Sequence, residues 1–378
     1  MKNKKLIICF LGNASTVHMI KWAGFLSGNG HDVHLFSFEN PETQDLKGIN
    51  MHIIDRKKYL GLKPINFLMN LPSNLSQLKK LIKEIKPGII HAHYVSSYGI
   101  IASLLKFRPF VVTVWGSDVL VAPKNFFPLK LAIKYAFSKA DLITCDAEHM
   151  KEAMIKLGVN ESKIKIINFG VDTKRFMPGP KSEEIKERLG FSNNKLIISL
   201  KWPDPISDYE TLIKAAILVL KKNPESRFII LGPTSFPSYL KELKNIVNKL
   251  GINNEFKFLG NVSYDKVPEY LKTSDIYVST SLSDAGLSSA TAEAMSCGLP
   301  VIITDFGDNK KWVENNKNGF LFETKDYKRL AEKITYLLNN ENIGKEFGEI
   351  SRRIIREKND YYNEMAKMEK LYFGLINK

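Results

Sequence analysis

The chain alternates short apolar, β-branched runs with segments of helical length, and this pattern begins twice. In residues 1–177 the runs predict seven strands, at Leu6–Phe10, Val33–Phe38, Met51–Ile54, Ile89–Ala92, Phe110–Val114, Leu142–Thr144 and Ile164–Ile167. Beyond them the runs predict six more, at Leu196–Leu200, Phe228–Leu231, Phe256–Leu259, Ile276–Ser279, Val301–Thr304 and Phe320–Phe322. Strands that alternate with helices form parallel sheets joined by crossover helices. The pattern therefore predicts an α/β protein of two consecutive doubly wound units.

A linker is predicted between these two units. Lys174–Pro180 contains two prolines and a glycine, and proline disfavours helix on its N-terminal side. We therefore expect a first domain over residues 1–177 and a second over 178–359. Residues 360–378 have apolar and aromatic side chains at helical spacing, so this last helix needs a surface to cover. A length of 378 residues also exceeds the usual size of one hydrophobic core.

Cysteine usage and hydropathy indicate the compartment. Cys9, Cys145 and Cys297 are odd in number, far apart and not at metal-ligand spacing, which favours a reduced cytoplasm. The apolar run Leu6–Leu11 is too short for a signal peptide, and no later segment approaches the ~20 apolar residues of a spanning helix. We expect a cytoplasmic protein that at most binds the inner face of a membrane peripherally.

The net charge of +15 is concentrated in the first half of the chain. Residues 1–177 hold 25 Lys and Arg against 13 Asp and Glu, and the remainder holds 30 against 27. Basic and apolar residues interleave between Lys57 and Lys86 and in Asn125–Phe137, a composition that suits helices lying on anionic lipid. Solvated lysines, or helices that pack their apolar side on their own sheet, are the alternatives. The sequence has no nucleic-acid recognition module, so nucleic acid is not an expected partner.

The loop after the predicted strand Ile276–Ser279 holds the densest set of chemical groups. In open parallel sheets, ligands bind beyond the carboxyl ends of the strands. Gly286 lets backbone approach a ligand closely, and Ser288-Ser289 can begin a helix whose free N–H groups suit a diphosphate. The loop is therefore a candidate anion cradle.

Two acids flank this cradle. Ser289 and Glu293 are four residues apart and share a helix face, where a carboxylate can accept two hydrogen bonds from a ribose diol. Asp284 lies across the turn and can hold a sugar hydroxyl. The alternative is that Asp284 caps a turn and that Glu293 makes a helix-capping contact.

The segment Glu293-Ala294-Met295, with Gly298 and Pro300-Val301, resembles the C-terminal signature of the retaining family 4 glycosyltransferases of the GT-B fold, the glycosyl transferases group 1. This family usually has Glu eight positions before the second acid, where this chain has Ala285, with Asp284 one residue earlier. The resemblance extends over nearly the whole chain in the family's order, through Asp141–Thr144, Leu157–Val159, Asn168–Asp172, Phe256–Val262 and Asn318–Leu321.

The resemblance implies two Rossmann-like domains facing a central cleft, with the helix 360–378 crossing back onto the first domain. It implies hexosyl transfer with retention, from a nucleotide-sugar donor to a glycan or lipid-linked acceptor in surface polysaccharide or glycoconjugate synthesis, without metal or cofactor. It assigns catalysis to Asp284, Glu293 and Lys201. It assigns donor binding to Gly12, Asn13, Gly232, Pro233, Val262, Gly286, Leu287, Ser288 and Ser289, and the acceptor or sugar side to His93, Trp115 and Asp118.

Three further positions depart from the family. Lys201 stands where an Arg usually clamps the diphosphate, and Ser207 stands where a Lys usually does. Trp115 replaces the His that commonly touches the transferred sugar. Trp115 either packs against a sugar face, marks a site for a different donor, or is a core residue. Lys201 is either the clamp or an ordinary strand-end lysine, and His93 either contacts the substrate or has a structural role.

Two other functional classes remain open from the sequence. One is a sugar-nucleotide epimerase of the same fold, against which the Glu-Ala-Met motif speaks. The other is a sugar-binding protein with weakened catalysis, which the departures at Trp115 and Ser207 motivate.

Overall fold

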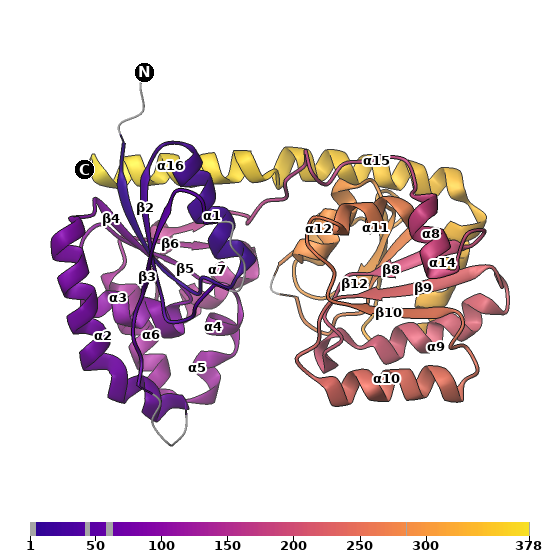
Figure 1. Cartoon of the computed structure of the whole chain (residues 1–378), viewed down its shortest axis with the longest axis horizontal. Coiled ribbons are helices and arrows are strands. Elements are labelled where there is room, and N and C mark those ends of the chain that lie inside the picture. Colours follow the sequence, from indigo (N-terminus) through magenta and orange to yellow (C-terminus); the bar gives the residue numbers. More distant parts are fainter. Residues whose placement is uncertain (1–4, 42–45, 58–62, 285, 378) are drawn as a thin grey trace. The chain divides into compact units, whose positions relative to one another are not determined.

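The computed structural model describes residues 5–41, 46–57, 63–284 and 286–377. The chain divides into two compact units, residues 1–169 together with 362–378, and residues 170–361 (Figure 1). The boundary therefore precedes the one expected after Met177. The physical reason is that Val171 and Phe176 are buried in the hydrophobic core of the second unit.

The first unit contains a sheet of seven parallel strands in the order β3-β2-β1-β4-β5-β6-β7. The strands are β1 (Ile7–Leu11), β2 (Asp32–Ser37), β3 (Ile49–Ile53), β4 (Ile89–His93), β5 (Phe110–Thr113), β6 (Leu142–Cys145) and β7 (Ile164–Ile166). Each lies within two residues of its predicted position. Four strands, β1, β4, β5 and β6, are buried almost throughout, because helices cover both faces of the sheet.

The helices of the first unit are α1 (Val17–Gly28), α2 (Lys63–Ile85), α3 (Ile100–Leu104), α4 (Ser117–Leu120), α5 (Ala122–Asn125), α6 (Phe127–Lys139) and α7 (Glu148–Lys156), with a π-helical turn at Val95–Gly99. Helix α1 begins where the Thr16 side chain accepts a hydrogen bond from the Met19 N–H, and Trp22 is among the residues it buries. Trp22 thereby lies against His93 at the end of β4, with ring centroids 5.0 Å apart.

The C-terminal helix α16 (Tyr361–Ile376) packs on the first unit (Figure 1). The fully buried Tyr372 hydroxyl bonds to His91 Nδ1 at 2.5 Å, and Glu369 bonds to the buried His31 Nε2 at 2.7 Å. These contacts satisfy polar groups that would otherwise be buried without partners. The helix therefore closes the core of the first unit.

The second unit contains six parallel strands in the order β10-β9-β8-β11-β12-β13. They are β8 (Lys195–Ser199), β9 (Ser226–Leu231), β10 (Phe256–Gly260), β11 (Ile276–Ser279), β12 (Val301–Thr304) and β13 (Gly319–Phe322). The helices are α8 (Glu183–Leu189), α9 (Tyr209–Leu220), α10 (Pro237–Lys249), α11 (Val267–Thr273), α12 (Ser289–Ser296), α13 (Asn309–Trp312), α14 (Tyr327–Asn339) and α15 (Glu341–Lys358).

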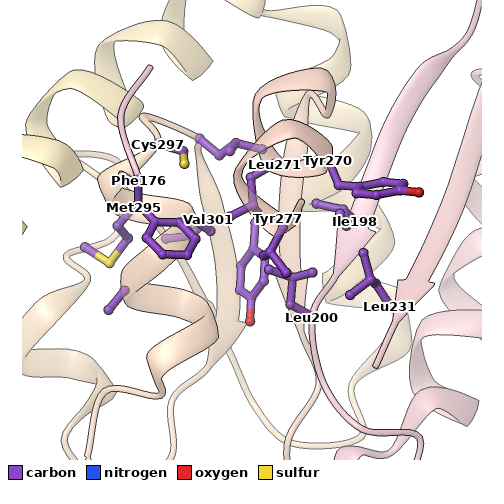
Figure 2. Packing of buried hydrophobic residues seen from close by; sticks show 14 of the residues in the cluster. Phe176, Ile198, Leu200, Leu231, Tyr270, Leu271, Tyr277, Met295, Cys297 and Val301 are labelled. Carbon is purple, nitrogen blue, oxygen red and sulfur yellow. The ribbon is translucent and has the colours of Figure 1, made fainter. Parts of the chain in front are cut away.

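The sheet of the second unit has a hydrophobic core on each face. Along β8, Leu196 and Ile198 belong to one buried cluster and Ile197 to the other, as the alternation of side chains across a strand requires. Figure 2 shows part of the first cluster, in which Phe176 lies beside Met295 of α12. Helix α12 is thereby packed against both its sheet and the segment that begins this unit.

The three cysteines, Cys9, Cys145 and Cys297, are free thiols, and burial raises the pKa of each to about 12. Among the helices of the described residues, none has both the length and the apolar character needed to span a bilayer.

Candidate active site

In the second unit, three neighbouring strands carry predicted site residues beyond their carboxyl ends. The strands β9, β8 and β11 lie side by side, and are followed by Gly232, Lys201 and the loop of Asp284. Gly232 has a φ of +148°, and a Cβ there would lie 3.0 Å from the Lys201 carbonyl oxygen. Glycine at this position therefore lets the two strand ends approach closely.

The structure brings Lys201 and Asp284 together as an ion pair. Their side chains are only 16% and 9% exposed, and Ser281 Oγ also donates to Asp284 Oδ1 at 3.4 Å. The Tyr209 hydroxyl fixes the backbone of Lys201, because it accepts from Lys201 N at 3.2 Å and donates to Lys201 O at 2.7 Å. Ala285, where the family usually has the first acid, lies outside the described residues.

Ser207 has no part in the exposed surface of this site. Its side chain is buried and its Oγ donates to the Trp202 carbonyl oxygen at 2.7 Å. The hydroxyl therefore stabilises its own loop, while Lys201 carries the positive charge at this strand end.

Helix α12 begins in the predicted loop. Ser288 is its N-cap, and the Ser288 Oγ accepts from Thr291 N at 3.3 Å. Gly286 and Leu287, both buried, precede the cap directly. The first turn contains no acidic residue, so its free N–H groups and positive dipole end are not neutralised by a carboxylate of the helix itself. This end of α12 has the chemistry of an anion site.

Glu293 lies on the same helix and is buried. Its Oε1 accepts a hydrogen bond of 2.7 Å from the Tyr264 hydroxyl. The Tyr264 ring lies 5.5 Å from the Phe176 ring and 4.5 Å from the Arg175 guanidinium carbon. Burial and the Glu293 charge hold the pKa of Tyr264 well above its usual range, so the phenol remains a donor. The structure thus shows Glu293 held by a tyrosine, with Ser288 providing the helix cap.

Sequence reasoning missed Tyr264, although it lies two residues after the predicted donor residue Val262. Val262 itself packs at the edge of the core cluster that contains Tyr277. Pro233 adjoins Gly232, and the next residue, Thr234, donates through Oγ1 to Pro203 O at 3.0 Å, which ties the loops after β8 and β9 together.

In the first unit, predicted residues gather at the carboxyl ends of β1, β4 and β5, which are neighbours in the sheet. His93 Nδ1 accepts a hydrogen bond of 3.2 Å from Trp115 Nε1. The Trp115 ring is half-buried and stacks on His18 at 4.7 Å. Gly12 follows β1, and a Cβ there would lie 3.5 Å from His93 Cβ. Asn13 stabilises the turn after β1, because its Oδ1 accepts from Ser15 N at 2.8 Å.

Both imidazoles beside Trp115 are neutral at physiological pH. Burial, followed by the charge of His18, lowers the pKa of His93 to about 3, and burial, followed by the charge of Lys21, lowers the pKa of His18 to about 4. Because Nδ1 of His93 is an acceptor, its proton is on Nε2.

The Asp118 carboxylate binds the backbone of the two segments that follow β4 and β5. It accepts from Trp115 N at 3.0 Å and from Val95 N at 2.9 Å, and it is almost fully buried. Burial raises the pKa of Asp118 to about 6, although these hydrogen bonds act in the opposite direction. The sequence predicts a polar binding residue here, whereas the structure buries the carboxylate and gives it two backbone partners.

His91 is also engaged within the protein. Its Nε2 bonds to Thr113 Oγ1 at 2.6 Å, and its Nδ1 is the partner of Tyr372. His91 and His93 lie on the same side of β4, as the alternation predicts, with ring centroids 4.6 Å apart.

A helix N-terminus, a cation and a buried carboxylate at neighbouring strand ends are the elements with which doubly wound proteins recognise nucleotides. The fold therefore defines an α/β protein of two doubly wound units, and the second unit carries groups suited to binding a nucleotide. Residues 181–354 match the family Glycosyl transferases group 1, and residues 7–147 match Glycosyl transferase 4-like.

The chain is 31% identical to the UDP-Gal:alpha-D-GlcNAc-diphosphoundecaprenol alpha-1,3-galactosyltransferase of Escherichia coli, over 69% of each chain. It is 27% identical to an uncharacterized glycosyltransferase of Methanocaldococcus jannaschii, over 67% of this chain and 63% of that protein. The Anabaena protein HepE in complex with UDP-glucose has the same fold, with a TM-score of 0.83, 21% identity, and coverage of 98% of this chain and 100% of HepE. The chain belongs to the group 1 glycosyltransferases and has the GT-B fold.

Proposed function

We propose that this glycosyltransferase moves a hexosyl unit, with retention, from a nucleotide-diphosphate sugar to a glycan or lipid-linked acceptor in surface polysaccharide or glycoconjugate synthesis. The observation that supports this most is the grouping of Lys201, the α12 N-terminus and Glu293 in one unit. UDP is the first nucleotide to test, because HepE binds UDP-glucose and the E. coli relative acts on UDP-Gal.

The donor site separates charge recognition from ribose recognition. The Lys201 ammonium and the free N–H groups of α12 stabilise the charge that develops on the departing diphosphate. The Glu293 carboxylate, oriented by Tyr264, accepts hydrogen bonds from the ribose hydroxyls. Asp284 orients the Lys201 ammonium and accepts from a hydroxyl of the transferred sugar.

The reaction follows a front-face path. The bond between the anomeric carbon and the phosphate oxygen breaks, and the acceptor oxygen bonds to that carbon on the same face. The departing phosphate oxygen takes the acceptor proton. Because the cation and the helix N–H groups carry the phosphate charge, we propose that no metal ion or cofactor is required.

Within the first unit, Trp115 is proposed as a sugar-binding residue. A half-buried indole offers an apolar face to the C–H groups of a pyranose ring, and the neutral His93 holds the indole through its N–H. Trp115 thus takes the place of the family's usual histidine by packing.

The acceptor is proposed to be attached to a membrane lipid. The acceptor named for the E. coli relative carries a diphosphoundecaprenol group. In addition, the basic excess of this chain lies in residues 1–177. We therefore place the protein in the cytoplasm, peripherally on the inner face of the membrane.

A panel of UDP-, GDP-, ADP- and CMP-sugars, each with and without a GlcNAc-diphospholipid acceptor, tests the proposal. The expected result is nucleotide release with one nucleotide class, stimulated by the acceptor and accompanied by a glycosylated lipid. Epimerised sugar without acceptor would indicate the epimerase class. Nucleotide binding without turnover would indicate a sugar-binding protein.

A further inference from the structure

Helix α6 has two apolar faces, and the described residues cover only one of them. Ile133, Ala136 and Phe137 are buried, and the helix packs against α3 and the π-helical turn at Val95–Gly99. Phe127 and Leu131, in contrast, are 69% and 52% exposed. A helix needs only one apolar stripe to pack on its own unit, so the second stripe has no role in this fold.

The exposed face is a continuous strip. Phe127, Leu131 and Tyr135 are spaced by four residues and therefore lie one above the other on the helix surface. Phe126, which is 52% exposed, directly precedes α6 and extends the strip at its N-terminus. We call Phe126, Phe127, Leu131 and Tyr135 the α6 strip.

Lysines line this strip and acids are absent from its sequence. Lys130 and Lys134, also four residues apart, form the adjacent row, and Lys124 and Lys139 lie toward the two ends. The Lys139 ammonium is 5.1 Å from the centroid of the Tyr135 ring. Between Asp118 and Asp141 the chain contains no Asp or Glu. An apolar strip whose own segment of the chain carries only positive charges complements an anionic, amphiphilic surface.

From this geometry we propose that the α6 strip is a membrane-docking surface, with the aromatic side chains in the headgroup region and the lysines on anionic phosphates. The inference rests on the proposed lipid-linked acceptor and adds the residues that bring the protein to it. Phe and Leu side chains partition into the interface, and each nearby lysine strengthens binding to an anionic leaflet about fivefold. Because the lysine contribution is screened by salt, attachment is reversible.

The test is co-sedimentation of the full chain with phosphatidylcholine vesicles that contain increasing phosphatidylglycerol, at low and at physiological ionic strength. Wild-type protein is expected to pellet with anionic vesicles, more strongly at low salt, and to stay in the supernatant with pure phosphatidylcholine. Equal binding to both vesicle types, or none to either, overturns the proposal.

Two variants assign binding to the strip. Lys130→Gln/Lys134→Gln should reduce the partition coefficient at low salt roughly thirtyfold, since each lysine contributes about fivefold. Phe127→Ser/Leu131→Ser should reduce it at least about tenfold at both salt concentrations, because apolar insertion is not screened. The matched controls are Lys156→Gln/Lys165→Gln and Ile155→Ser, which change exposed residues of the same unit outside the strip. Strip variants that bind like wild type, or controls that weaken binding equally, overturn the assignment.

Failure of this inference is distinguishable from failure of the proposed function. Phe127→Ser/Leu131→Ser should keep wild-type nucleotide release with a water-soluble acceptor, and lose rate only with acceptor embedded in vesicles. Unchanged rate with the embedded acceptor counts against docking through the strip. Absence of nucleotide release in the wild-type protein counts against the glycosyl transfer, whichever way the vesicles behave.

Discussion

Replacing Lys201 by Met separates the two roles that the structure gives this side chain. The Lys201 and Asp284 side chains are 16% and 9% exposed, so the substitution leaves a buried carboxylate without its cation, at a cost of about 3–5 kcal/mol in unfolding free energy. It also removes one preorganised donor to the departing diphosphate, which is expected to lower kcat/KM by about 10²–10³-fold. Lys195→Met is the matched control, because its pair with Glu341 is on the surface and should contribute at most about 1 kcal/mol.

A double variant and a conservative one complete the experiment. Lys201→Met/Asp284→Asn removes both charges and should regain most of the lost stability in urea unfolding, while nucleotide release stays low. Lys201→Arg keeps the charge and should retain most of the activity, since the family commonly has Arg here. If Lys201→Met lowers stability but leaves kcat/KM within a few-fold of wild type, the lysine is structural and the clamp assignment is wrong.

The remaining predictions concern the ribose contact, the metal requirement and pH. Glu293→Ala should abolish turnover and nucleotide binding in calorimetry on a folded variant, and Tyr264→Phe should weaken nucleotide binding at least about tenfold without changing pyrophosphate affinity; unchanged nucleotide affinity would remove either assignment. Activity should survive EDTA, and a rate lost with EDTA and restored by magnesium or manganese would contradict the helix-cradle account. The pKa of His93 is about 3 in the folded state, below its value of about 6.5 in the unfolded state. The unfolded state therefore takes up the proton first as the pH falls. This difference should lower the free energy of unfolding by about 2 kcal/mol at pH 5. Asp118, with a folded pKa raised to about 6, offsets part of this loss between pH 6 and 4, and a His93→Asn variant with the same slope of stability against pH would refute the assignment.

The strands could be predicted because their signal is local. Runs such as Ile276–Ser279 and Val301–Thr304 are β-branched and buried on both faces, and their bounds in the structure are those predicted. The position of the domain boundary could not be predicted in the same way, because it depends on contacts between residues that are distant in the sequence. Val171 and Phe176 join the second core through packing against residues far along the chain, and the proline-rich segment gave no sign of that contact.

Some features of the candidate site could also be predicted from neighbouring residues in the sequence, and others depend on tertiary contacts. The Ser288 cap and the spacing of Ser289 and Glu293 follow from neighbouring residues in the sequence. The Tyr264–Glu293 hydrogen bond and the Trp115–His93 pair join residues from different strand ends, and no periodicity encodes such partners. The burial of the Ser207 side chain and the exposure of one apolar face of α6 depend on which side of each element packs against its unit. Tertiary structure decides which side that is.

The most direct test of glycosyl transfer is one reaction with UDP-hexose and a GlcNAc-diphospholipid acceptor, in which UDP release and the anomeric configuration of the product are measured together. If the protein transfers a hexosyl unit with retention, UDP release requires the acceptor, and the NMR coupling constant of the glycosidic product shows the anomeric configuration of the donor. Release of UDP without a glycosidic product, or a product of inverted configuration, would contradict it.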